Sequence, residues 1–464
     1  MSFFSRLLPK AYIYGKILYH SQKIGGNDIS FAYIVKNKLK EIISSVTSHT
    51  EAYVKRPDKD FTRKRGLPLD TVIALLISMG GNSLRIELLE HTNYDIKTVT
   101  TSAFVQQRDK ILPEAFAFIL NEFTNSFNDK KTCKGHRLFA IDGSDLNIAH
   151  NPKDLDTYFQ DKPDRKGYNQ LHLNAMFDLN NKLYQDVIIQ PGKKKNECCA
   201  LTDMVDRSNV DGDVIVIADR GYEGYNVFAH IEQKGWKYLI RAKDIDSNGI
   251  AAALNLPKYG EFDKTVHITL TRKHTKKVRE NRELYKFISS TTTFDYLDYE
   301  ENQYYSLSLR VVRIRISDDV YETIITNLNP FQFPPTVIKE LYHLRWGIES
   351  SFRELKYAIG LICFHSKTVG HIIQEIYAKL IMYNFCELIT LNVVIEQKYT
   401  KHAYQVNFTH AILICVRFFR CTDNMPPVYA EALIALDILP VRPGRSDPRK
   451  VKPKSVVSFI YRVS

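Results

Sequence analysis

Apolar side chains in the first part of the chain recur at helical spacing. Residues 69–79 (LDTVIALLISM) and 83–91 (SLRIELLEH) each carry an apolar face, and a Gly-Gly pair separates them. The segment 101–116 (TSAFVQQRDKILPEAF) continues this spacing and predicts one further helix. Short helices joined by glycine turns are typical of DNA-binding domains, and equally of any small helical bundle. Residues 1–130 are therefore predicted to be helical.

Beyond residue 131 the pattern changes to short apolar strands. Three strands, a helix, a strand, a helix and a strand follow one another. This is the element order of a ribonuclease H-like α/β fold, with a mixed sheet and helices on both faces. The predicted elements are strands 138–148, 171–179 and 183–190, a helix over 196–207, a strand over 214–218, a helix over 225–234 and a strand over 237–241.

Alternating segments such as 265–271 and 305–316 then predict a β-rich insertion. A strand over 322–327 and a long helix over 335–359 resume the core, and helices continue to about residue 438 before a basic tail that contains proline. The predicted division is a helical region over 1–130, expected to bind a DNA end, the first part of the catalytic core over 131–243, the β-rich insertion over 244–320, the remainder of the core over 321–362, and a helical C-terminal region with a basic tail over 363–464.

Charge adds a candidate partner to this picture. The 464 residues have a net charge of +12, with 44% apolar and 25% charged residues, which is ordinary for a globular chain and excludes general disorder. A basic surface attracts polyanions, so the charge favours nucleic acid, although many basic proteins bind none. The basic residues are clustered at 55–65, 193–195, 272–282 and 442–454.

Cysteine usage and hydropathy indicate a cytoplasmic protein. The seven cysteines include no CxxC pair and no matching histidine spacing, which argues against a disulfide framework and a zinc site. The first twenty residues lack the apolar core and cleavage site of a signal peptide. Residues 378–395 are apolar, but Asn384 and Glu387 in their middle predict a buried helix and not a membrane span.

The long helix over 335–359 has two distinct faces. One apolar stripe faces the core, and beside it Tyr342, Arg345, Glu349 and Lys356 share a second face. Two basic residues one and two turns from a carboxylate could bind phosphate, or they could form ordinary surface ion pairs. The stripe consists of Leu341, Leu344, Ile348, Phe352, Leu355 and Ile359.

Two aspartates lie at predicted strand ends. Asp142 follows the apolar strand LFAI and precedes glycine, and Asp219 follows VIVIA and precedes Arg220 and Gly221. An Asp at such a place is often only a turn former. Together with Glu349, however, these carboxylates would repel one another unless cations were bound, and oxygen-rich sites suit Mg²⁺ or Mn²⁺. Two such ions would support phosphoryl transfer.

These residues carry a family resemblance. Tyr342, Arg345, Glu349 and Lys356 match the Y-x2-R-x3-E-x6-K pattern of bacterial insertion-sequence-four transposases, and the IDGS and ADRGY contexts of the two aspartates resemble the family's other motifs. The resemblance covers roughly residues 60–455. It implies a DDE triad in a ribonuclease H-like core with a β-rich insertion.

The resemblance also implies roles for these residues. Asp142, Asp219 and Glu349 would bind the metals, two ions of Mg²⁺ or Mn²⁺. The expected activity is nicking of double-stranded DNA at terminal inverted repeats and strand transfer into target DNA, within a synaptic dimer in the bacterial cytoplasm, near the nucleoid and away from membranes. Tyr342, Arg345 and Lys356 would contact the transposon end, with Lys356 on a phosphate. Arg220 is a DNA-contact candidate only from its place beside Asp219, where it could reach phosphate or only tune the carboxylate.

Four further residues have simpler interpretations. Glu197 could lie near the site, but an acidic residue at a helix N-terminus is common for its own sake. His172 is interpreted as a core histidine. Trp236 and Trp346 could stack on bases, although packing is the simpler role for both.

Two other classes of protein remain open. A non-catalytic DNA-binding protein derived from a transposase would lose a triad carboxylate, and all three are present. A structure-specific nuclease of the same fold would cleave without strand transfer, but the helix pattern and the insertion favour transposition.

Overall fold

The computed structural model describes residues 23–24, 27–28, 30–63, 67–127, 130–160, 162–318, 320–395, 403–422, 425, 427–441 and 460–461. The expectations for residues 1–22 and for the basic tail over 442–454 lie outside these ranges.

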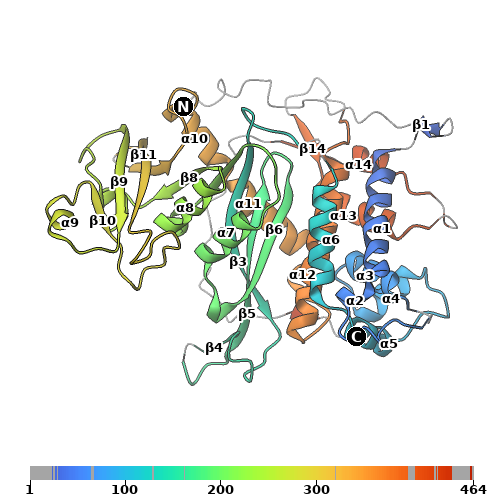
Figure 1. Ribbon diagram of the computed structural model, residues 1–464. Coiled ribbons are helices and arrows are strands. Elements are labelled where there is room, and N and C mark those ends of the chain that lie inside the picture. Colours follow the sequence, from blue (N-terminus) through green and yellow to red (C-terminus); the bar gives the residue numbers. More distant parts are fainter. Residues whose placement is uncertain are drawn as a thin grey trace.

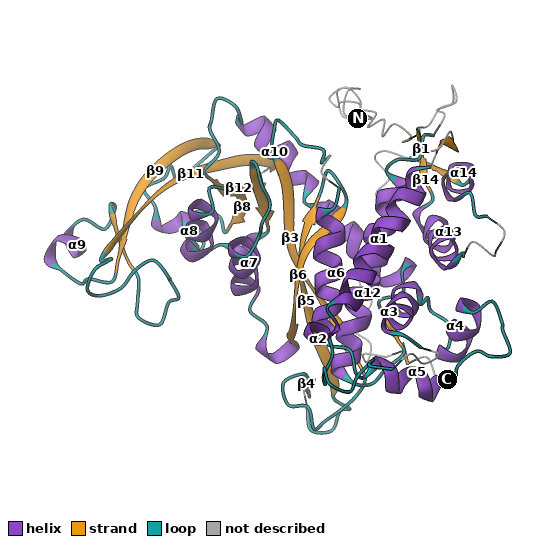
Figure 2. Ribbon diagram, turned by 45° about the vertical axis from the view of Figure 1, so that its right-hand side comes forward, coloured by secondary structure: helices purple, strands orange, loops and turns teal. Residues whose placement is uncertain are grey.

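One ten-stranded sheet forms the centre of the molecule (Figures 1 and 2). Its order is β10-β9-β11-β12-β8-β7-β3-β5-β4, with β6 paired to β5, and β3, β7 and β8 run parallel. The predicted core strands are confirmed to within a few residues. The strands are β3 (Arg137–Ile148), β4 (Tyr158–Phe159), β5 (Tyr168–Asp178), β6 (Leu183–Pro191), β7 (Val214–Ala218), β8 (Lys237–Ala242), β9 (Phe262–Thr271), β10 (Tyr285–Phe287), β11 (Tyr304–Ser317) and β12 (Val320–Thr326).

The β-rich insertion interrupts the core in sequence but not in the sheet. β12 pairs antiparallel with β8, β11 pairs with β12, and β9 pairs with β11. The inserted strands therefore extend the core sheet beyond β8. An uncovered sheet edge presents unpaired backbone groups, and further strands satisfy them.

Helices cover both faces of the sheet. Alternate residues of β3 face opposite sides of the sheet, and each side has its own apolar cluster. Phe139 and Ile141 pack toward α7 and α8, whereas Ala140 packs on the opposite side with α6 and α12. Figure 1 shows α7 and α8 in front of the strands and the α6–α12 layer beside them. These helices are α6 (Pro113–Asn125), α7 (Glu197–Asp206), α8 (Tyr225–Gln233) and α12 (Val369–Thr390).

The N-terminal and C-terminal helices form one layer. Their apolar residues belong to a single buried cluster that includes α1, α3, α6, α12 and α13 (Figure 2). The predicted single helix over 101–116 is wrong, because α5 ends at Arg108 and Pro113 begins α6, where its missing N–H has no helical partner to lose. The remaining helices are α1 (Phe31–Ser48), α2 (Thr50–Tyr53), α3 (Leu69–Ser78), α4 (Leu84–His91), α5 (Thr101–Arg108), α9 (Lys276–Glu280), α13 (Phe408–Arg420) and α14 (Ala430–Leu436).

Short strand pairs occur outside the main sheet and were not predicted. One of them, β1–β2, lies in the region expected to be wholly helical. The pairs are β1 (Lys23–Ile24) with β2 (Asn27–Asp28), β13 (Cys363–Phe364) with β16 (Ile460–Tyr461), and β14 (Tyr404–Val406) with β15 (Ile438–Pro440).

The apolar segment around residues 378–395 is a buried helix up to Thr390, as predicted. Its polar residues have partners: the Asn384 side chain donates to the backbone oxygen of Tyr184, and Glu387 accepts from Tyr383 and Thr390. Burial raises the pKa of Glu387 to about 7. Across the described part of the chain, no helix has the length and apolarity needed to cross a bilayer.

Candidate active site

The sheet brings Asp142 and Asp219 together. Ile141 of β3 lies opposite Ala218 of β7 in the parallel register, so the aspartate that follows each of them stands at the same edge. Asp142 accepts a hydrogen bond from the N–H of Gly143 at 2.9 Å, and Asp219 accepts one from the N–H of Gly221 at 2.8 Å. The prediction that Asp142 lies at a strand end is wrong, because β3 continues along β5 to Ile148.

The helix that carries Glu349 is not one continuous α-helix. It consists of α10 (Pro335–Leu344), α11 (Trp346–Arg353) and a π-helical turn, η4 (Glu354–Ala358). The apolar stripe is buried as predicted except for Leu344, which is 46% exposed and is the last residue before the break in the helix. Such π-turns are frequently found at functional sites.

Arg345 lies at this break and joins two of the carboxylates. Its Nη2 donates to Glu349 Oε1 at 2.8 Å, and its Nη1 lies 3.8 Å from Asp142 Oδ2. The guanidinium is buried, with one orphan donor: Nε has no hydrogen-bond partner among the described residues. A charged donor held by burial in this position compensates the carboxylates on either side of it.

The three carboxylates act on one another electrostatically. Burial raises the pKa of Asp142 to about 6, and the charges of Asp219 and Glu349 add to that increase. The hydrogen bond from Gly143 and the charge of Arg345 act in the opposite direction. Arg345 is shared between Asp142 and Glu349, so the three carboxylates keep an excess of negative charge that favours the binding of a cation.

The residue types of this group fit a hard divalent cation, because all three donors are carboxylate oxygens. The three carboxylates are spaced more widely than the ligands of a formed metal site. Within the described ranges, no three Asp, Glu, His or Cys side chains converge closely enough to hold one ion. Arg345 stands between Asp142 and Glu349.

The predicted DNA-contacting residues differ in accessibility. Tyr342 is buried, and its hydroxyl has no hydrogen-bond partner among the described residues. Lys356 donates from Nζ to the backbone oxygen of Asp145 at 3.1 Å, close to the first aspartate. Arg220 is exposed at the turn after Asp219.

The two tryptophans also differ. Trp236 is buried edge-on against Phe139, as predicted. The predicted packing role of Trp346 is wrong, because this side chain is 53% exposed. The Arg345 guanidinium lies 5.2 Å from its ring centroid. An exposed indole next to the site can stack on a base.

His172 and Glu197 lie nearer the site than the sequence suggested. His172 is buried, but its neighbours are carboxylates: Nδ1 is 2.6 Å from Asp145 Oδ1, and Nε2 is 3.0 Å from Glu197 Oε1. Asp145 was not singled out at all. Strand alternation could have placed it on the same face as Gly143, but the register that sets it opposite His172 is not visible in the sequence.

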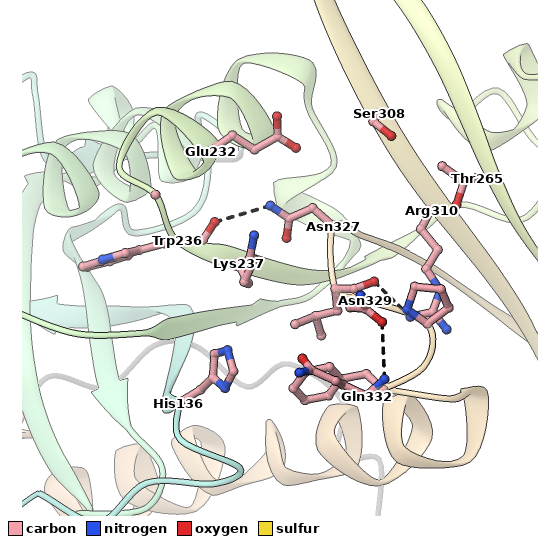
Figure 3. Close-up of a pocket in the computed structure, with 14 residues that line it drawn as sticks. His136, Glu232, Trp236, Lys237, Thr265, Ser308, Arg310, Asn327, Asn329 and Gln332 are labelled. Atoms are coloured by element: carbon pink, nitrogen blue, oxygen red, sulfur yellow. Dashed lines mark hydrogen bonds between the residues drawn. The ribbon is translucent and has the colours of Figure 1, made fainter.

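A cavity lies elsewhere in the molecule. It measures about 580 Å³ and is lined by residues at the amino ends of β3 and β8, including His136, Trp236 and Lys237 (Figure 3). The aspartates stand at the carboxyl ends of the parallel strands, which is where open α/β sheets bind ligands. The cavity is therefore at the opposite edge and is not the candidate active site.

Comparison with known proteins identifies the class. A family model described as "Transposase DDE domain" matches residues 134–385. A solved chain from the cryo-EM structure of the piggyBac transposase synaptic complex with hairpin DNA is similar, with a TM-score of 0.44 and 11% identity over 90% of this chain and 88% of that one. No curated protein matches the sequence.

The family model spans more than half of the chain, so the protein belongs to the transposase DDE domain family. It is a DDE transposase, a metal-dependent enzyme that cleaves DNA. The prediction of this enzyme class from Asp142, Asp219 and Glu349 is confirmed.

Proposed function

We propose that this protein is a transposase of the insertion-sequence-four type from a bacterium. It binds the inverted-repeat ends of an insertion sequence and moves the element by cut-and-paste transposition. Asp142, Asp219 and Glu349 bind the divalent ions, two of Mg²⁺ or Mn²⁺, in a ribonuclease H-like core. The observation that carries the proposal is Arg345, which is hydrogen-bonded to Glu349 and faces Asp142, so residues more than 200 positions apart share one site.

Divalent ions bound there would supply stabilisation of the charge that develops at the scissile phosphate. The protein's own residues would place the DNA. Arg345 would bind a phosphate of the DNA, since the planar guanidinium pairs bidentately with phosphate as it does with carboxylate. Lys356 and Arg220 bind neighbouring phosphates as positive charges on either side of the triad.

DNA end recognition would involve other parts of the chain. The N-terminal helices are proposed to contact the inverted repeat, and Tyr342 is proposed to contact the end nucleotides. Two copies of the protein would hold the two ends in a synaptic dimer, because each transposon has two ends that must be cut and joined together.

The test is a cleavage assay on a labelled duplex that carries the flanking inverted repeat. Wild-type protein with Mg²⁺ or Mn²⁺ should leave a 3′-OH nick at the repeat boundary and should join that end to a target plasmid. Asp219→Asn should abolish both products, because an amide binds the metal too weakly. Asp213→Asn, an exposed residue just before the same strand, is the matched control and should cleave normally.

Two results would overturn the proposal. Cleavage by Asp219→Asn at the wild-type rate would remove this residue from the metal site. Nicks without any joined product, across metals and target plasmids, would favour the structure-specific nuclease.

A further inference from the structure

Glu197, the first residue of α7, lies against the two glycines that follow the aspartates in the chain. Its Oε1 is 3.0 Å from the point at which a Cβ on Gly143 would stand, and its Oε2 is 3.8 Å from the corresponding point on Gly221. Gly143 follows Asp142, and Gly221 lies two residues after Asp219. The carboxylate therefore approaches the group from the α7 face of the sheet, while Asp142 faces Arg345 on the other side.

Glycine at position 143 is what permits this approach. A Cβ there would stand 2.4 Å from His172 Nε2 and 2.8 Å from its Cε1, which no real packing tolerates. A side chain at this position would have to displace the imidazole, and its Cβ would also lie 3.0 Å from Glu197 Oε1. The missing side chain at Gly143 thus leaves room on the α7 face of β3 for His172 and Glu197.

The imidazole of His172 orients Glu197. Asp145 lies directly opposite His172 in the β3–β5 register and accepts from its Nδ1 at 2.6 Å. The other ring nitrogen is 3.0 Å from Glu197 Oε1, a charge contact that is not aligned as a hydrogen bond. Lys195 Nζ, 3.3 Å from Asp145 Oδ1, partly neutralises the outer carboxylate.

A second observation indicates that a ligand belongs in this group. Tyr222 is 1% exposed, and its hydroxyl has no hydrogen-bond partner among the described residues. Burial raises the pKa of its phenol, and the charges of Glu197, Asp142 and Asp219 raise it further. Leaving a buried hydroxyl unpaired is unfavourable, and the lone pairs of its oxygen are available to a cation held among the carboxylates.

We propose that Glu197 is a fourth carboxylate ligand of the divalent metal site and that His172, anchored by Asp145, is its positioning residue. This inference rests on the proposed function, since it adds a ligand to the site of Asp142, Asp219 and Glu349. The ligand would be a hard cation such as Mn²⁺, because every donor is an oxygen.

The first test measures Mn²⁺ binding to the full chain without DNA, by the EPR signal of free Mn²⁺. Glu197→Gln should weaken binding by about 10–100-fold, and Asp219→Asn should weaken it at least as much. Asp203→Asn, an exposed acid-to-amide change on the same helix, should bind as wild type does. Wild-type affinity in Glu197→Gln alone overturns this inference and leaves the proposed function intact. Wild-type affinity in both Glu197→Gln and Asp219→Asn overturns the proposed function as well.

The second test uses wild-type protein and is independent of how any variant folds. Fe²⁺ with ascorbate generates radicals that cut the backbone next to a bound ion. Cuts at residues 142–143, 219–221 and 196–198 support four carboxylates at one site. Cuts at the first two places with none at 196–198 overturn the assignment of Glu197.

The role of His172 is tested by additivity. His172→Ala should weaken Mn²⁺ binding less than Glu197→Gln does, and the double variant should bind no more weakly than Glu197→Gln alone, because the imidazole acts only through that carboxylate. Additive losses would overturn the positioning role, since a histidine that merely supports the fold would lower the affinity independently.

Discussion

The ion pair between Arg108 and Glu375 ties the N-terminal helices to α12, and breaking it should destabilise the protein strongly. Both side chains are buried. Arg108 donates to Glu375 Oε1 at 2.9 Å, to the backbone oxygen of His371 at 2.8 Å and to Gln374 at 3.2 Å. Arg108→Met keeps the apolar volume and removes every one of these donors.

Two estimates of the cost agree. Burial would raise the pKa of Glu375, but the charge of Arg108 and hydrogen bonds from His365 outweigh it and lower the pKa from 4.5 to about 2. That shift corresponds to about 3 kcal/mol of stability at neutral pH. Removing one partner of a buried pair costs about 3–5 kcal/mol in general. Arg108→Met should therefore lower the free energy of unfolding by about 3–5 kcal/mol.

The assay is urea unfolding followed at pH 7 and pH 3. The folded pKa of Glu375 is depressed, so its stabilisation is present above pH 4.5 and is lost as the pH falls toward 2. The difference between wild type and Arg108→Met should therefore shrink at pH 3. Replacing both partners with Met should recover most of the loss, because no buried charge is then left alone.

A surface pair is the control. Lys38→Met removes an exposed partner of Glu41 and should change stability by less than about 1 kcal/mol. A cost for Arg108→Met as small as this control at pH 7, or one that is the same at pH 3, would refute the reasoning.

Three further predictions concern the site and the core. Gly143→Ala should abolish DNA cleavage and lower the melting temperature, because its Cβ would overlap a neighbouring imidazole, whereas Gly370→Ala, where nothing lies within 4 Å, should do neither. Glu387→Gln should raise stability at pH 8 by up to about 3 kcal/mol but change it little at pH 5, since the raised pKa of this acid makes its ionisation costly between pH 4.5 and 7; equal effects at both pH values, or an effect as large for the exposed Glu300→Gln, would contradict this. Trp346→Ala should weaken binding to the transposon end in a gel-shift assay by about 1–3 kcal/mol with an unchanged melting temperature, and unaltered binding would exclude stacking by this exposed indole.

The sequence alone determined the local elements and predicted the three carboxylates of the candidate site. Apolar alternation located the strands that carry Asp142 and Asp219, and the helical stripe located Glu349. Carboxylates at those places predicted a metal-dependent enzyme acting on DNA, and the family match confirms it. These features could be read because strand and helix periodicities are set by neighbouring residues.

Only the tertiary structure decided how these elements meet. The break at Arg345, the pairing of β12 with β8 and the joint layer of N- and C-terminal helices all depend on contacts between distant residues. The same holds for Glu197, which periodicity marks only as the start of a helix. It becomes a candidate ligand because α7 docks where Gly143 has no side chain. Strand register and helix docking are chosen by complementary surfaces far apart in the chain, and no local pattern encodes them.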